Sequence, residues 1–168
     1  RAFANGVLKA LIARGAVDEA FVAAHTTGFT ALHATLDAQD WPLLERESGV
    51  TRTEMERFAA LYHAARSAVF VWSMGITQHY CGVENVAAII NLALARGMVG
   101  RPHTGLMPIR GHSGVQGAAE CGSVPNVLPG GDPLDDPTAR ARCEAVWGFP
   151  IPTAPGMMTG AMLDAAHA

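Results

Sequence analysis

The hydrophobic period of the chain changes between residues 53 and 97, and this change constrains the fold most. Residues 53–66 repeat apolar side chains at helical spacing. A continuous apolar run follows from Ala68 to Trp72, which is typical of a strand covered on both faces. Residues 83–96 again carry apolar side chains on one helical face. The order helix, strand, loop, helix predicts an α/β fold with a parallel sheet.

The flanking segments predict short helices and one long loop. Residues 5–66 have the spacing of several helices, and Thr51 with Glu54 forms a capping-box pattern. Residues 97–122 are rich in glycine, so we expect a long loop with at most a short helical turn after Gly117. In the proline-rich remainder we expect helices at 136–147 and 159–166. Residues 68–72 are then the one expected strand.

Three segments follow from these patterns: a helical segment at 1–66, an α/β core at 67–122, and a proline-rich and helical tail at 123–168. An α/β sheet with one strand is incomplete, and the chain starts at Arg1 without an initiator methionine. We therefore expect all three to be parts of one larger, truncated domain. Its expected class is a partial three-layer Rossmann-like α/β domain with a helical N-terminal part and a long glycine-rich loop.

Composition excludes several classes of protein. Hydrophobic residues make up 49% of the chain and charged residues 16%, which favours a packed core over disorder. The net charge of −3 comes without a cluster of lysine or arginine, which argues against nucleic acid as a partner. Cys81, Cys121 and Cys143 are far apart, so no metal site is expected, and reduced thiols favour a cytoplasmic protein. No apolar run reaches about 18 residues, so we expect no membrane span.

Residues 74–79 lie directly after the predicted strand, where ligands bind in open α/β sheets. Gly75 allows close backbone approach, and the polar side chains that follow suit a heterocycle or a phosphate: Thr77, Gln78 and His79. The next helix start could add N–H groups, although Glu84 in its first turn would repel a phosphate at the tip. The alternative interpretation is a polar loop that caps this helix.

Residues 107–117 form a second candidate site. Arg110 offers a planar fork of donors for an oxyanion, and His112 can exchange a proton near neutral pH. Together they are typical of an anion-binding and proton-transfer site. The alternative is an arginine that ties the loop to carbonyl groups and a histidine that is exposed to water.

An ordered series of motifs carries a family resemblance. The motifs are W-S-M-G-I-T-Q-H at 72–79, E-N-V at 84–86, N-L-A-L at 91–94, G-M-V-G-R-P at 97–102, G-L-M-P-I-R-G-H-S at 105–113 and V-Q-G at 115–117. Over about residues 68–122 the series resembles the molybdopterin oxidoreductases of the formate dehydrogenase alpha-subunit type. It is most similar to the branch with histidine in the R-G-H-S motif.

The resemblance implies a bis-molybdopterin guanine dinucleotide cofactor with molybdenum or tungsten, and two-electron redox chemistry on a small-molecule substrate. The residues implied to face the cofactor are Met74, Gly75, Thr77, Gln78, His79, Gly111, Gln116 and Gly117. Arg110 matches the family's active-site arginine, with His112 beside it, and both are expected to be catalytic. Classical formate dehydrogenases commonly have glutamine in place of His112, which argues against formate as the substrate. Gly114 stands where asparagine is common.

The resemblance also implies parts that this chain lacks. A 4Fe-4S cluster and the metal-ligating cysteine or selenocysteine are expected upstream, and a pterin-binding domain downstream. A protein that accepts electrons is a further implied partner. We therefore expect the 168-residue chain alone to be inactive.

Two other function classes remain as hypotheses. One is a non-catalytic nucleotide-binding or regulatory module of the same fold. The other is a hydrolase with His79 or His112 as the base, which no serine or cysteine nucleophile motif supports.

Overall fold

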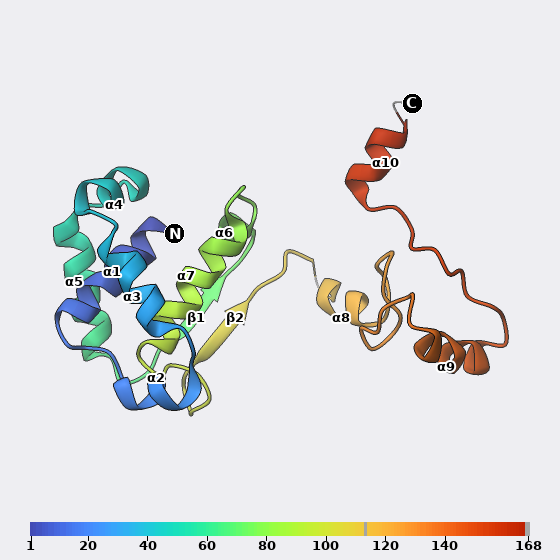
Figure 1. Cartoon of the computed structure of the whole chain (residues 1–168), viewed down its shortest axis with the longest axis horizontal. Coiled ribbons are helices and arrows are strands. Elements are labelled where there is room, and N and C mark those ends of the chain that lie inside the picture. The colour runs from blue at the N-terminus through green and yellow to red at the C-terminus, as the bar shows by residue number, and fades with distance from the viewer. Residues whose placement is uncertain (113, 167–168) are drawn as a thin grey trace. The chain divides into compact units, whose positions relative to one another are not determined.

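Helix α1 (Ala2–Ala13) lies in the middle of the first of two compact units, Arg1–Ile109 and Arg110–Ala168. The computed structural model describes residues 1–112 and 114–166 (Figure 1). The first unit also contains α2 (Glu19–His25), α3 (Phe29–Asp37), α4 (Trp41–Ser48), α5 (Arg52–Ala64), β1 (Val69–Trp72), α6 (Met74–Thr77), α7 (Gly82–Leu94) and β2 (Gly105–Pro108). The second unit contains α8 (Val115–Glu120), α9 (Pro137–Trp147) and α10 (Thr159–Ala166).

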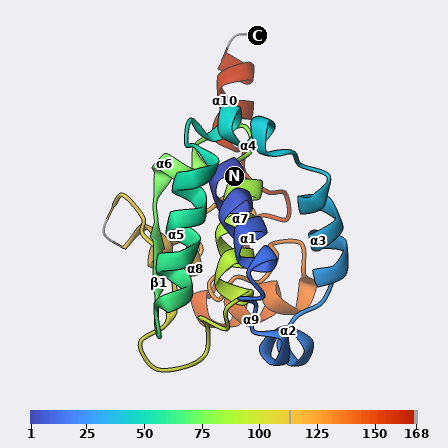
Figure 2. The same ribbon diagram turned by 90° about the vertical axis from the view of Figure 1, so that its left-hand side faces the viewer.

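The core of the first unit forms around α1, which packs against α3, α4, α5 and α7. Figure 2 shows α1 flanked by α5 and α3, with α7 alongside. Val7, Leu8 and Leu11 recur at helical spacing and are fully buried. They meet large buried side chains from neighbouring elements, which are Leu36, Leu44, Met55 and Met98.

Short local sequence signals fix the ends of α4 and α5. Asp40 caps α4 by accepting a hydrogen bond from the Leu43 backbone nitrogen at 2.8 Å. The same helix ends at Gly49 in the left-handed conformation. Thr51 and Glu54 form the expected capping box of α5. Hydrogen bonds from the Thr51 hydroxyl and backbone hold the pKa of the Glu54 carboxyl below its ordinary value.

The expected parallel sheet is confirmed, but it has a second strand. β1 pairs in parallel with β2, in a register that joins Val69 to Gly105 and Trp72 to Pro108. The prediction that residues 97–122 form a loop with no strand is therefore wrong. Proline lacks a backbone donor, yet it is tolerated at the end of an edge strand, so Pro108 does not prevent this pairing. Helix α8 also begins earlier than expected, at Val115 rather than after Gly117.

The two faces of β1 differ in burial. Phe70 packs edge-on against Tyr62 of α5, with ring centroids 5.6 Å apart, and the Tyr62 hydroxyl donates to the Leu92 carbonyl at 3.1 Å. Burial raises the pKa of Tyr62 well above its ordinary range. On the other face, Val69 and Val71 are 53% and 54% exposed. The predicted cover on both faces of this strand is therefore wrong for the described part of the chain.

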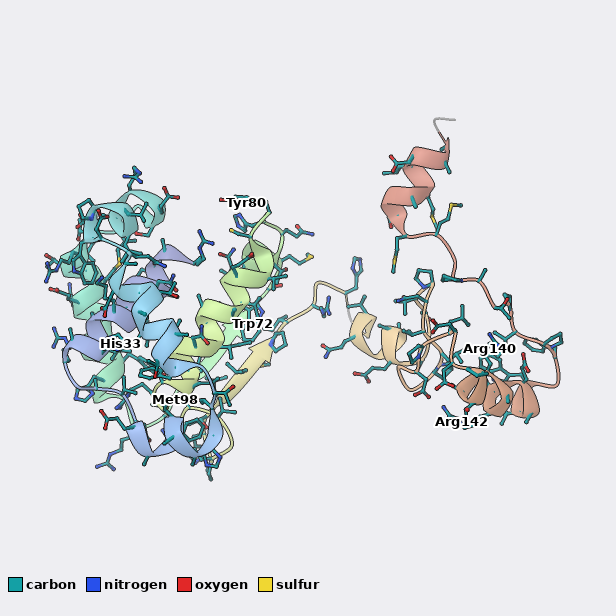
Figure 3. All side chains as sticks on the ribbon, viewed as in Figure 1. His33, Trp72, Tyr80, Met98, Arg140 and Arg142 are labelled. Atoms are coloured by element: carbon teal, nitrogen blue, oxygen red, sulfur yellow. The ribbon has the colours of Figure 1, made fainter. Side chains whose placement is uncertain are left out.

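The second unit consists of short helices and turns. As the sequence predicts, α9 is capped by Asp136, begins at Pro137 and ends before Gly148. Arg142 of α9 forms an ion pair with Asp132, and Figure 3 labels this arginine. Over the described ranges in both units, every helix is too short or too polar to cross a bilayer.

Candidate functional site

The candidate loop at residues 74–79 leaves the carboxyl end of β1, as the sequence predicts, but its first four residues form the short helix α6 where only a loop was expected. Helix α6 begins two residues after the strand, and α7 packs beside it (Figure 1). The strand β2 ends at the same edge of the sheet, because Trp72 pairs with Pro108 and the Ile109 nitrogen donates to the Trp72 carbonyl at 2.7 Å. In parallel sheets this edge is where ligands bind.

Hydrogen bonds within the loop bring two pairs of predicted site residues together. The His79 Nε2 atom lies 3.0 Å from the Gly75 carbonyl oxygen. Because a carbonyl oxygen can only accept, Nε2 carries the proton and Nδ1 is left as an acceptor in the neutral ring. The Gln78 backbone nitrogen donates to the Met74 carbonyl at 2.8 Å, and its side-chain amide nitrogen lies 3.5 Å from the Met74 sulfur atom.

The outer surface of this loop is polar and open to solvent. Gly75, Thr77, Gln78 and His79 are all exposed, and the neighbouring Tyr80 is 99% exposed at the tip (Figure 3). Within the described residues, the Thr77 hydroxyl makes no hydrogen bond to protein. A β-carbon on Gly75 would meet no other protein atom within 4 Å, so neither packing nor its φ angle requires glycine there. The loop can therefore accept a polar ligand against its backbone.

The second candidate segment, residues 107–117, is divided between the units: residues 107–109 belong to the first, and residues 110–117 belong to the second and are described within it. Arg110 and His112 are exposed. Arg110 makes no hydrogen bond or ion pair with another described residue, and its guanidinium carries five N–H donors. Gly111, Gln116 and Gly117 are exposed as well, and a β-carbon on Gly117 would meet no atom within 4 Å. Ser113 of the R-G-H-S motif lies outside the described residues.

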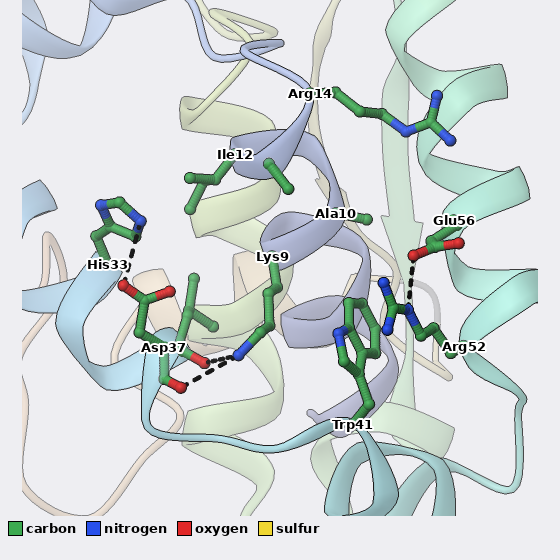
Figure 4. Close-up of a pocket in the computed structure, with 11 residues that line it drawn as sticks. Lys9, Ala10, Ile12, Arg14, His33, Asp37, Trp41, Arg52 and Glu56 are labelled. Atoms are coloured by element: carbon green, nitrogen blue, oxygen red, sulfur yellow. Dashed lines mark hydrogen bonds and ion pairs between the residues drawn. The ribbon is translucent and has the colours of Figure 1, made fainter.

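A cavity of about 390 Å³ opens elsewhere in the first unit, between α1, α3, α4 and α5 (Figure 4). Two of the cations that line it, Lys9 and Arg52, have protein partners. Lys9 donates to three backbone carbonyls in the last turn of α3 and just after it, those of Leu36, Asp37 and Gln39. The Arg52 guanidinium lies 4.8 Å from the Trp41 ring centroid and pairs with Glu56 at 2.7 Å. The bonds of Lys9 join α1 to α3, the Arg52–Trp41 contact joins α5 to α4, and the Arg52–Glu56 pair lies within α5. None of the sequence-predicted site residues lines this cavity.

Sequence reasoning missed Asn85, the buried polar residue beneath the candidate loop. It is 8% exposed and shares a face of α7 with Ala88 and Leu92, which are also buried. A polar residue on the apolar face of a predicted helix is the signal that could have found it.

Metal ligands do not gather in either unit: within residues 1–112 and 114–166, no three side chains of histidine, cysteine, aspartate or glutamate lie close enough to hold an ion.

Comparison with known proteins gives a consistent set of relatives, while no family model matches the chain. Formate dehydrogenase H of Escherichia coli (strain K12) is 36% identical over 147 residues, which are 88% of this chain and 21% of that protein. The protein named Probable oxidoreductase YjgC of Bacillus subtilis (strain 168) is 36% identical over 163 residues, 97% of this chain and 16% of that protein.

The similarity extends to an archaeal protein. The F420-dependent formate dehydrogenase 1 subunit alpha of Methanococcus maripaludis is 38% identical over 126 residues, 75% of this chain and 19% of that subunit. The chain thus spans between 16% and 21% of the length of these three relatives.

Proposed function

Because the chain is homologous to a segment of the formate dehydrogenase-like oxidoreductases, we propose that it forms part of the cofactor and substrate wall of a molybdopterin-dependent enzyme. The full-length protein would catalyse two-electron oxidation or reduction of a small substrate. The observation that carries this proposal is the open loop at residues 74–79, at the carboxyl end of a parallel strand.

The groups along this loop fit a molybdopterin guanine dinucleotide in kind. Pterin and guanine rings carry several hydrogen-bond donors and acceptors, and Thr77, Gln78 and the Nδ1 atom of His79 offer both. The open space at Gly75 leaves room for a ring or a diphosphate against the backbone. Met74, which is 45% exposed, adds an adaptable apolar contact. When bound, the molybdenum or tungsten cofactor supplies the redox step.

The residues of the second segment would act on the substrate. The Arg110 guanidinium would hold an oxyanion of the substrate and orient it by two parallel hydrogen bonds. His112 would accept or release a proton at a ring nitrogen as the substrate changes its charge. Gly111, Gln116 and Gly117 would face the cofactor, because their small or polar groups are exposed and open.

Further parts of the proposal concern the whole protein. The segments at 1–66, 67–122 and 123–168 would be parts of one larger Rossmann-like domain, whose sheet continues beyond β1 and β2. The full-length protein would be cytoplasmic, with a 4Fe-4S cluster upstream and a protein partner that takes up electrons. Formate is not the substrate we expect, since His112 replaces the glutamine common in classical formate dehydrogenases.

The test is metal and pterin analysis of the full-length protein, purified from a host that makes the molybdenum cofactor. We expect one molybdenum or tungsten atom per chain, together with two guanine nucleotides released by acid, because the proposed cofactor holds two pterin guanine dinucleotides per metal. Turnover is measured on a panel of small oxidisable substrates with a redox dye as the electron acceptor. Guanine nucleotide binding without metal would instead support a non-catalytic nucleotide-binding module.

A further inference from the structure

Asn85 is buried on α7 directly behind the candidate loop, with 8% of its surface exposed. Its side-chain nitrogen donates to the Ile76 carbonyl at 2.9 Å. Its side-chain oxygen accepts from the backbone nitrogen of Arg1 at 2.9 Å and lies 3.7 Å from the Cys81 sulfur atom. A buried amide is stable only when such partners satisfy it, so its orientation is fixed by these contacts.

The bond to the Ile76 carbonyl stabilises α6, which is too short to satisfy its own carbonyl groups. Helix α6 has four residues, and the carbonyls at a helix end have no partner within the helix. The His79 ring donates to the carbonyl of Gly75, and the Gln78 backbone nitrogen donates to that of Met74. Asn85 donates to the next carbonyl, that of Ile76, and this bond joins the backbone of α6 to α7.

Gly82, at the start of α7, makes a second connection to the same loop. A β-carbon at this position would overlap the Thr77 carbonyl oxygen and lie 2.9 Å from its carbonyl carbon. The φ angle of Gly82 is not positive, so glycine is needed here for close backbone approach and not for conformation. Two successive peptide groups, those of Ile76 and Thr77, therefore contact α7.

We propose that Asn85 and Gly82 are positioning residues for cofactor binding. They hold the inner side of residues 74–79 against α7, so that Thr77, Gln78 and His79 face outward in one fixed arrangement. Held in this way, the loop loses less conformational entropy when it binds a ligand, and affinity rises accordingly. This inference rests on the proposed function, because the loop must contact the cofactor for its orientation to matter.

The test uses the full-length holoenzyme and the variant Asn85→Asp. This change is nearly isosteric and keeps the acceptor oxygen, but it replaces the donor to Ile76 with a second oxygen that repels the carbonyl. Asn91→Asp is the matched control, because Asn91 lies on the same helix and its side chain makes no hydrogen bond to another described residue. Gly82→Ala is a second variant, which displaces the Thr77 peptide and leaves the Asn85 amide intact.

A third comparison distinguishes a positioning role of Asn85 from a role in the stability of the fold. Leu36→Ala removes a fully buried core side chain remote from the loop in the contact pattern, and should lower the thermal midpoint of unfolding. If Asn85 only stabilises the fold, Leu36→Ala with an equal fall in midpoint should release cofactor equally fast. Cofactor release is followed by the fluorescence of the oxidised pterin after dilution of the protein.

We expect Asn85→Asp and Gly82→Ala to release pterin at least about tenfold faster than the wild type, a loss of about 1.4 kcal/mol. Asn91→Asp and Leu36→Ala should release it at the wild-type rate. If folded Asn85→Asp releases pterin at the wild-type rate, the inference is overturned and the proposed function stands. If Asn85→Asp does not fold, a wild-type release rate in Gly82→Ala overturns the inference in the same way. A wild-type protein purified without pterin overturns the proposed function and the inference together.

Discussion

The backbone nitrogen of Ile109 donates to the carbonyl oxygen of Trp72 at 2.7 Å, and this bond joins the carboxyl ends of β1 and β2. The chain therefore leaves both strands at the same edge of the sheet. Residues 74–79 begin just after one strand end, and Arg110 follows the other in the sequence. Both candidate segments thus leave the sheet at neighbouring strand ends.

The exposed face of the sheet gives a prediction about stability that compares the 168-residue chain with the full-length protein. Val71 is 54% exposed in this chain, whereas parallel sheets are normally covered on both faces. Val71→Lys should change the free energy of unfolding of the 168-residue chain by less than about 0.5 kcal/mol. In the full-length protein it should cost about 2 kcal/mol or more, because the charge would be buried. Urea unfolding of both proteins measures the difference.

Ala31→Lys on the exposed side of α3 is the control for that experiment and should have a small effect in both proteins. A small effect of Val71→Lys in the full-length protein would contradict a continued, covered sheet.

Tyr62 gives a prediction for alkaline pH. Burial raises the pKa of its phenol in the folded protein, so folding favours the protonated form. Its contribution to stability is complete below the ordinary value of 10.0 and is lost as the pH rises above that value toward the raised pKa. Tyr62→Phe should cost about 1 kcal/mol at neutral pH, through loss of the bond to Leu92, and should remove this alkaline component.

Thermal unfolding of the wild type and Tyr62→Phe between neutral pH and pH above 10.0 checks the point. Tyr80→Phe serves as the control, because Tyr80 is 99% exposed and should leave the profile unchanged. If the wild type and Tyr62→Phe lost the same stability at alkaline pH, groups other than Tyr62 would cause that loss.

Arg110 should control turnover more than cofactor content. In the full-length enzyme, Arg110→Ala should lower kcat/KM by about 10²- to 10³-fold, the usual result of removing a donor to a developing oxyanion. Arg110→Lys should recover part of this, since it keeps the charge and loses the planar fork. Steady-state kinetics and metal analysis are measured side by side.

Arg46→Ala, on the exposed surface of α4, is the matched arginine control for Arg110 and should leave kcat/KM unchanged. If Arg110→Ala turned over at the wild-type rate with full metal content, Arg110 would have no place in the site.

The isolated 168-residue chain should not retain the metal cofactor. It spans between 16% and 21% of the length of the relatives it matches, so the proposed cofactor would lose the contacts that the rest of the protein supplies. Elemental analysis of the chain purified from a cofactor-producing host should find far less than one molybdenum per chain. Stoichiometric molybdenum would show instead that the described loops suffice to bind it.

Helix ends were predictable because their signals are local. Asp40 before α4, Gly49 after it and the capping box at Thr51 act within one turn of the chain. The strand β2 was not predictable in the same way. Its four residues are bounded by Gly105 and Pro108, and its stability comes from pairing with β1, more than 30 residues earlier. Contacts at that separation leave no local pattern.

The position of the candidate loop could be predicted, but its support could not. The order of strand and helix places residues 74–79 at a strand end without further information. Asn85 looks in the sequence like an interruption of an apolar helix, since its bond to Ile76 exists only once α6 folds back onto α7. The exposure of Val71 was also missed, because an apolar run indicates which side chains prefer burial and not what covers them.

The half-buried side chain of Lys9 has a practical consequence, because this is the one lysine in the sequence. All three of its ammonium protons are directed to carbonyls, those of Leu36, Asp37 and Gln39. A lysine-specific protease has a single cleavage site in this segment, in the middle of α1, and can reach it only when the helical cluster opens. Its cleavage rate would therefore report local unfolding of the first unit at one peptide bond, without any label.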